Sequence, residues 1–280
     1  MTAPILSARR LTQSFASRAG GWRRRVVRAV DNVDLDVCEG ETLAIVGESG
    51  SGKSSLARLL LGLRRPDSGQ ILYRGEDFST LSPARRRAYR REVQAVFQDP
   101  AASLNPRLRV QDTLAHVMLH HRLATRSTVR DAAAAELHAV GLTPPDNFLA
   151  RYPHQLSGGQ QQRVAIARAM ALRPRLIIAD EPLSSLDISV QTQLLELMTE
   201  LQQRTGLGFV VISHDLGAVD SIAHRVAVMY RGRIVESGEQ ALRRPQHPYT
   251  KALVNATLIP DPRLARARHH LAPAEPVPSS

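Results

Sequence analysis

The sequence has little cysteine and few aromatic residues. Cys38 is its single cysteine, and aromatic residues make up 4% of its 280 residues. One cysteine excludes an internal disulfide framework and a cysteine-rich metal site, and it fits a reducing compartment, with Cys38 as a small buried side chain. So few aromatic rings give little support to a platform that stacks single-stranded nucleic acid.

Long hydrophobic runs are also absent. No apolar run approaches the ~20 residues that span a bilayer, and the first residues lack the apolar stretch of a secretory signal. We therefore expect a chain that is soluble by itself. Its hydrophobic content of 43% is sufficient for a full core, as one large domain or as a domain with a subdomain.

Lysine is scarce although the chain is strongly basic. The net charge is +11, yet only Lys53 and Lys251 among 37 basic residues are lysine. Arginines gather before the first acidic residue, Asp31, and again over 85–91. The favoured interpretation is an arginine-rich solvated surface, and the alternative is attraction to anionic headgroups or to a charged partner.

One of these two lysines stands in a glycine-rich loop between a predicted strand, Leu43–Val46, and a helical pattern over 55–61. Glycines allow positive φ and close approach to phosphate oxygens, Lys53 supplies charge to the β- and γ-phosphates, and the Ser54 hydroxyl can ligate Mg²⁺. This is a P-loop, or Walker A motif. The predicted ATP-binding residues of the loop are Gly47, Glu48, Ser49, Gly50, Ser51, Gly52, Lys53, Ser54 and Ser55.

Before the P-loop, the pattern predicts short strands around Ile5–Leu6 and over Val33–Val37, with a loop over 19–25. Phe15 and Val30 are candidates to pack against an adenine ring, and a core position is the alternative for Phe15. Beyond the P-loop helix we predict a strand over Gln70–Tyr73 and a basic helix that Ser82 caps.

A further predicted strand, Val93–Phe97, ends in Gln98. The pattern then turns helical over 110–140, which predicts a helical insertion over about 99–155. His116, His120 and His121 could place two imidazoles on one helix face as a metal pair, but a solvated or partner-facing helix is the favoured interpretation.

A second phosphate-binding pattern follows the insertion. Ser157 precedes two glycines and Gln160 at the start of a predicted helix, Gln161–Leu172. A serine hydroxyl and free N–H groups at a helix start bind anions. One chain needs one such cradle per nucleotide, so the second cradle has no ligand of its own in this chain.

Two more predicted buried strands deliver polar residues at their ends. Leu176–Ala179 leads into Asp180 and Glu181, and Phe209–Ile212 leads into His214. At this edge of a parallel sheet we expect Asp180 to hold Mg²⁺, Glu181 to orient or deprotonate the attacking water, and His214 to bond the γ-phosphate or its attacking water. A polar loop with Asp187, a helix over 189–204 and a hairpin over 226–236 complete the pattern.

These elements resemble, in order, the ATP-binding subunit of an ABC transporter, over about residues 5–255. The resemblance implies an α/β fold: a P-loop NTPase, ABC-type ATPase domain with an antiparallel β subdomain and a helical insertion subdomain. It implies an ABC ATP-binding domain over 1–258, with a RecA-like core and the helical subdomain at about 99–172. The tail, 259–280, is rich in alanine, proline and arginine, which predicts disorder.

Two segments, Val96–Arg107 and His247–Leu253, resemble the peptide and nickel importer group of that family, although the tail lacks the cysteine-rich segment of many peptide members. The implied function is an ATP-hydrolysing subunit that energises an importer for oligopeptides or dipeptides. The alternatives are a nickel importer ATPase, with weak support from the histidines, and a nucleic-acid-associated ABC ATPase, which the single cassette and short insertion disfavour.

The resemblance also implies a site shared by two ATPase subunits, identical or paralogous, that face head to tail. It implies ATP as substrate and Mg²⁺ as cofactor, and it gives Gln98 a role in linking the site to the insertion. The implied catalytic residues are Glu181, His214 and Gln98; the implied Mg²⁺ ligands are Ser54, Gln98 and Asp180; the implied contacts to the partner's ATP are Ser157, Gly158, Gly159, Gln160 and Asp187.

Further implied partners are two transmembrane permease subunits and, through them, an extracytoplasmic substrate-binding protein. No nucleic-acid partner is expected. The chain would then lie peripherally on the cytoplasmic face of the inner membrane.

Overall fold

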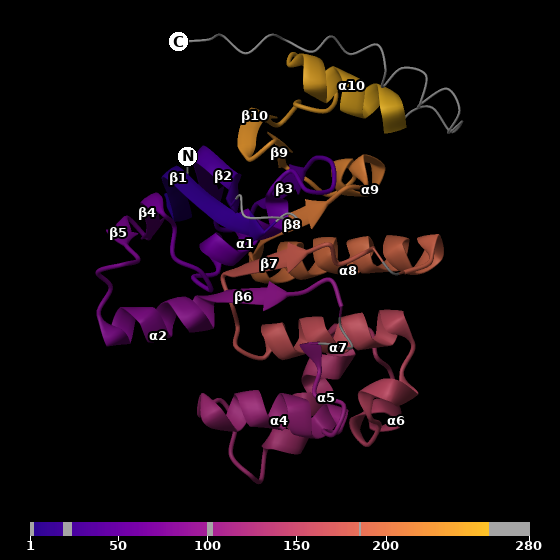
Figure 1. The fold of residues 1–280 in the computed structure, drawn as a ribbon. Coiled ribbons are helices and arrows are strands. Elements are labelled where there is room, and N and C mark those ends of the chain that lie inside the picture. Colours follow the sequence, from indigo (N-terminus) through magenta and orange to yellow (C-terminus); the bar gives the residue numbers. More distant parts are fainter. Residues whose placement is uncertain (1–2, 19–23, 100–102, 185, 258–280) are drawn as a thin grey trace, which may run out of the picture.

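The computed structural model describes residues 3–18, 24–99, 103–184 and 186–257. Two sheets lie side by side, and a group of helices extends from one of them (Figure 1). Residues 19–23 of the loop predicted over 19–25, residues 100–102 of the importer-like segment, and the predicted disordered tail at 259–280 lie outside the described residues. Arg24 and Arg25, which we predicted as loop, belong to a strand.

The larger sheet has six strands in the order β10-β9-β3-β8-β7-β6. All its neighbours pair in parallel except β9 and β10, which form the predicted hairpin. Near-continuous apolar runs form its inner strands because helices or the second sheet cover both faces. The strands are β3 Thr42–Val46, β6 Val93–Val96, β7 Leu176–Asp180, β8 Gly208–Ser213, β9 Arg225–Tyr230 and β10 Arg233–Gly238.

Alternate residues of β3 enter two different cores. Leu43 and Ile45 pack with Leu56 of the helix after the P-loop and with the second sheet. Ala44 and Val46 pack with Val164 and other residues of the helices that follow the insertion. Because successive strand residues point to opposite faces, the P-loop helix and the helix that begins after Ser157 lie on opposite faces of this sheet.

The smaller sheet is antiparallel, in the order β2-β1-β4-β5. The prediction of two short N-terminal strands was wrong, because β1 and β2 are each 15 residues long and pair along their whole length. Pairing decides this length, since β1 is hydrogen-bonded to β2 on one side and to β4 on the other. The strands are β1 Pro4–Arg18, β2 Arg24–Cys38, β4 Ser68–Tyr73 and β5 Glu76–Asp77.

The helices are α1 Lys53–Leu60, α2 Pro83–Glu92, α4 Val110–His120, α5 Val129–Ala139, α6 Asp146–Leu149, α7 Gly158–Met170, α8 Ile188–Thr205, α9 Leu216–Asp220, α10 Pro248–Thr257 and the 3₁₀ turn Pro153–Gln155. Ser82 caps α2 as predicted, accepting the N–H of Arg85. No helix in the described ranges is long and apolar enough to cross a membrane.

The predicted helical stretch over 110–140 is two helices, α4 and α5. Arg122 takes a positive φ of 56° just after α4, which breaks the helical path. In Figure 1, helices α4 to α7 form one group beyond β6. In the chain, this group lies between β6 and β7. The division into a helical subdomain at about 99–172 and a domain ending at 258 stays a prediction.

Candidate functional site

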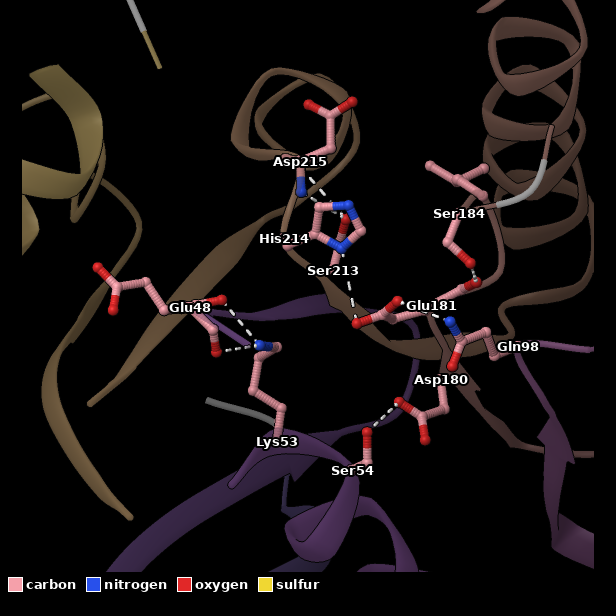
Figure 2. Close-up of polar contacts among 12 residues, drawn as sticks. Glu48, Lys53, Ser54, Gln98, Asp180, Glu181, Ser184, Ser213, His214 and Asp215 are labelled. Carbon is pink, nitrogen blue, oxygen red and sulfur yellow. Dashed lines mark hydrogen bonds and ion pairs between the residues drawn. The ribbon is translucent and has the colours of Figure 1, made fainter. Parts of the chain in front are cut away.

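The predicted site residues follow four strands of the six-stranded sheet. β3 leads into the P-loop, β6 leads towards Gln98, Asp180 ends β7, and His214 follows β8. These strands are neighbours and parallel, so their carboxyl ends meet at one edge, where ligands bind in open α/β sheets. Figure 2 shows the side chains of Lys53, Gln98, Glu181 and His214 at this edge.

The P-loop glycines are required by their surroundings as well as by their φ angles of 148° at Gly47, 81° at Gly50 and 111° at Gly52. A Cβ on Gly47 would lie 2.1 Å from the backbone oxygen of Met229, and one on Gly52 would lie 2.0 Å from that of Ala29. Close packing of the loop against neighbouring backbone therefore adds a reason for glycine beyond approach to phosphate.

Lys53 is buried and turned back onto its own loop. Its Nζ donates to the carbonyl oxygens of Gly47 at 2.7 Å and Glu48 at 2.8 Å. Burial lowers the pKa of Lys53, and the negative charges of Glu181 and Asp180 oppose this. No side chain caps the first turn of α1, so its N–H groups can bind an anion beside the ammonium group.

Ser54 and Asp180 form a hydrogen-bonded pair, with Ser54 Oγ 2.9 Å from Asp180 Oδ1. Burial raises the pKa of Asp180, and the bond from Ser54 opposes this increase. The predicted Mg²⁺ ligands are thus a hydroxyl, a carboxylate and the Gln98 amide, the oxygen donors that Mg²⁺ prefers. Few protein ligands with the remaining positions left to phosphate and water are typical of a Mg²⁺ site.

Glu181 contacts both other predicted catalytic residues. Gln98 Nε2 donates to Glu181 Oε2 at 3.1 Å, and His214 Nδ1 lies 3.6 Å from Glu181 Oε1 (Figure 2). The Glu181 backbone has a φ of 49°, an uncommon value for this residue type, and its N–H donates to Ile212 O. β8 thus holds this strained residue directly beyond the end of β7.

The Ser157 turn is a capping box. Ser157 Oγ accepts the N–H of Gln160 at 3.3 Å, and Gln160 Oε1 accepts the N–H of Ser157 at 3.1 Å. The capping box therefore uses the Ser157 hydroxyl oxygen and the backbone N–H of Gln160, two groups that we expected to face a ligand. The Ser157 hydroxyl proton and the N–H groups of Gly158 and Gly159, which have no partner within the helix, remain for one.

Gly159 also packs against the next helix. A Cβ on Gly159 would lie 2.5 Å from Cγ1 of Val190 in α8. Asp187 is the exposed N-cap residue of α8, without a side-chain capping bond. The structure therefore brings the Ser157 turn next to the start of α8, whereas α1 and α7 lie on opposite sheet faces.

The adenine prediction changes in one respect. Val30 is fully buried, so it has no surface to offer to a ring, and that prediction was wrong. Phe15 is half-buried, and the Arg64 guanidinium lies over its ring at 5.0 Å from the centroid. Val27, directly opposite Phe15 on β2 and 47% exposed, is an apolar neighbour that the sequence analysis missed.

The histidines of α4 are close to one another. The His116 and His120 rings stack at 6.4 Å, and His120 and His121 meet edge to face at 5.0 Å. Within the described ranges, these histidines are not part of any group of three or more His, Cys, Asp or Glu residues that could hold a metal ion. The interpretation of this helix as solvated or partner-facing stays a prediction.

A buried lysine in a glycine loop, a serine–aspartate pair and a half-buried glutamate lie together at one sheet edge. This combination suits the binding and hydrolysis of a nucleoside triphosphate. It defines the chain as a P-loop ATPase. A family model described as ABC transporter matches residues 30–184. The chain belongs to that family, as an ATPase with the ABC cassette fold.

Relatives resemble the chain over nearly its full length. It is 48% identical to the probable peptide ABC transporter ATP-binding protein y4tS of Sinorhizobium fredii, over 95% of this chain and 76% of that protein. It is 45% identical to the putative oligopeptide transport ATP-binding protein YkfD of Bacillus subtilis, over 96% and 80%. It is also 45% identical to the glutathione import ATP-binding protein GsiA of Pectobacterium atrosepticum, over 99% of this chain but only 44% of that protein.

Solved structures share the fold. The dimeric, post-hydrolysis state of the ATP-binding cassette MJ0796 bound to ADP and Pi matches with a TM-score of 0.72 and 29% identity, over 83% of this chain and 97% of that one. CbiO1 of Clostridium perfringens, part of the ABC transporter complex CbiONQ, matches with a TM-score of 0.73 and 25% identity, over 95% and 99%.

Proposed function

We propose that this chain is the ATP-hydrolysing subunit that energises an importer for oligopeptides, dipeptides or small peptides such as glutathione. Its likeness to y4tS, YkfD and GsiA supports the cargo class. Contact of Glu181 with both Gln98 and His214, beside Lys53 and Asp180, carries the proposal of hydrolysis.

The chemical step is attack of a water oxygen on the γ-phosphorus of ATP, with breakage of the bond from that phosphorus to the β–γ bridging oxygen. Glu181 orients the water and accepts its proton, while Gln98 and His214 hold the Glu181 carboxylate in place. His214 Nδ1 already faces Glu181, and as an imidazolium the ring can also donate through its other nitrogen to the γ-phosphate. ADP and phosphate are the products.

Ser54, Asp180 and Gln98 would hold Mg²⁺, which when bound neutralises charge on the β- and γ-phosphates. Lys53 exchanges its two bonds to loop carbonyls for bonds to phosphate oxygens. Because Lys53 is buried, little water has to be removed from it when ATP binds, which strengthens its attraction to phosphate.

The site is completed by a second ATPase subunit, identical or paralogous. We assign contacts to the partner's ATP to the Ser157 turn, residues 157–160, and to Asp187. Support comes from the placement of α1 and α7 on opposite faces of the sheet and from the dimeric form of MJ0796. ATP then closes the dimer because both halves bind its charge, and hydrolysis removes that bridge.

The helices between β6 and β7 would transmit closure to two permease subunits, with Gln98 linking them to the site. A substrate-binding protein outside the membrane would deliver the cargo. The chain would act peripherally at the cytoplasmic face of the membrane.

The test is reconstitution of the chain with its partner ATPase and permeases in proteoliposomes. We expect Mg²⁺-dependent ATP hydrolysis and uptake of labelled dipeptide in the presence of the binding protein. ATP hydrolysis without peptide uptake, but with uptake of a Ni²⁺ chelate, would overturn the cargo class and keep the ATPase.

A further inference from the structure

The C-terminal helix α10 contacts the P-loop directly. The hydroxyl oxygen of Tyr249 accepts the backbone N–H of Glu48 at 3.1 Å, although 201 positions separate the two residues. Glu48 is also one of the two residues whose carbonyl oxygens hold Lys53. The same peptide turn is therefore held by Lys53 on one side and by Tyr249 on the other.

A second contact supports the Tyr249 ring. Tyr249 stacks on Tyr230 at the end of β9, with 4.0 Å between ring centroids and 29° between the ring planes. The β9–β10 turn also reaches the P-loop itself, because the N–H of Gly232 donates to Ser51 O at 2.8 Å. One aromatic stack thus joins α10 to a turn that already contacts the phosphate loop.

The start of α10 is held by the neighbouring strand β10. The Glu236 carboxylate accepts the N–H groups of Gln246 at 2.8 Å and His247 at 3.0 Å. His247 Nδ1 then accepts the N–H of Tyr249 at 3.2 Å. These bonds set the position of Tyr249. His247 and Tyr249 belong to the segment 247–253, which the sequence analysis singled out without giving its residues a role in the site.

We propose that Tyr249 is a positioning residue for ATP binding: its hydroxyl holds Glu48 and so preorganises the P-loop around the phosphate position. Gly47, Gly50 and Gly52 make this loop costly to order, because glycine loses the most backbone freedom on ordering. A bond made before ATP arrives reduces the ordering that ATP binding must supply. The proposal rests on the proposed ATPase function.

A kinetic signature follows from this role. Once bound, the triphosphate and Lys53 order the loop by themselves, so loss of the Tyr249 hydroxyl weakens ATP binding and leaves the chemical step unchanged. KM and Kd for ATP increase while kcat stays constant, which is the behaviour of an interaction equal in ground and transition states. Burial raises the pKa of Tyr249, so the phenol stays protonated at neutral pH.

The experiment compares Tyr249→Phe with Tyr73→Phe in the full chain, each assembled with its transporter partners. Tyr249→Phe keeps the ring that stacks on Tyr230. Tyr73, a buried residue of β4, is the matched control, because its hydroxyl donates to Glu92 Oε2 at the end of α2 at 2.8 Å. Calorimetry gives the Kd of Mg²⁺–ATP, steady-state assays give KM and kcat, and thermal unfolding gives Tm.

We expect Tyr249→Phe to raise Kd and KM for ATP about threefold to tenfold, the effect of one hydrogen bond, with kcat within twofold of the unmodified chain. Tyr73→Phe should lower Tm by at least as much as Tyr249→Phe does, and it should leave the Kd for ATP unchanged. Unchanged Kd in Tyr249→Phe, or an equal increase in Tyr73→Phe, would overturn the positioning role. If the unmodified chain neither bound nor hydrolysed ATP, the proposed function itself would fail.

Discussion

Ser54 Oγ and Asp180 Oδ1 lie 2.9 Å apart although 126 positions separate these residues in the chain. Ser54 belongs to the first turn of α1, and Asp180 is the last residue of β7. The hydroxyl gives the buried carboxylate a hydrogen-bond partner, and the two oxygens together form part of the expected Mg²⁺ site. The bond therefore joins the two halves of the nucleotide site.

Asp180→Asn should stabilise the chain in the absence of metal while it abolishes Mg²⁺-dependent hydrolysis. Burial raises the pKa of Asp180 above its value in the unfolded chain, so the folded state binds the proton more readily. The ionised carboxylate thus opposes folding at neutral pH, and this penalty disappears as pH falls through the raised pKa. Asparagine removes the charge and keeps a hydrogen bond to Ser54.

The expected increase in Tm is about 2 °C at pH 7 in EDTA, and the difference from the unmodified chain should shrink towards acid pH. Differential scanning calorimetry at several pH values measures it. A lower Tm for the variant at pH 7 would contradict a destabilising charge, and unchanged hydrolysis would contradict the metal role.

Glu181→Gln should stop turnover and preserve ATP binding. The amide is isosteric and can still accept from Gln98, but it cannot take a proton from water. We expect kcat to fall on the order of 10²- to 10⁴-fold, with the Kd for ATP within about twofold. Phosphate release and calorimetry measure the two quantities. Glu196→Gln, an exposed change on α8, is the control, and near-normal turnover in Glu181→Gln would contradict the general-base role.

Lys53→Ala should weaken ATP binding about 10- to 100-fold, since it removes a charge-assisted contact to phosphate and the two bonds that shape the Gly47–Glu48 turn. Calorimetric titration with Mg²⁺–ATP measures this loss. The chain has a single other lysine, the exposed Lys251 on α10, so Lys251→Ala is a matched control. Equal affinity for Mg²⁺–ATP in the two variants would contradict the prediction that the P-loop binds the phosphates of ATP.

Gly159→Ala should lower Tm by about 2–6 °C, because its Cβ would press on Val190. The same displacement of α7 from α8 should reduce ATP hydrolysis. Val190→Ala in the same chain removes the obstructing methyl groups, so the double variant should recover Tm and hydrolysis together. Val190→Ala alone is the control. Recovery of Tm without recovery of hydrolysis would show that glycine is needed at the partner's nucleotide.

Much of the site could be predicted because its functional residues stand in short, recognisable sequence segments. Gly47–Ser54 contains the loop, its lysine and its hydroxyl, and the apolar runs before Asp180 and His214 place both at strand ends. The lengths of β1 and β2 could not be predicted in this way, since the pairing of these two distant segments with each other decides them. The same is true of Val30, whose pattern does not distinguish a core position from a ring contact.

The sequence by itself determined the phosphate loop and the succession along the chain of strands that end in polar residues. It also determined the family to which the chain belongs. Those features depend on residues within a few positions of one another, where backbone period and side-chain chemistry can be recognised. Tertiary structure alone decided that Tyr249 holds Glu48, that Gly159 packs on Val190, and that Glu181 meets both Gln98 and His214. Such pairs form because packed sheets and helices bring distant segments together. A local sequence pattern does not predict these contacts.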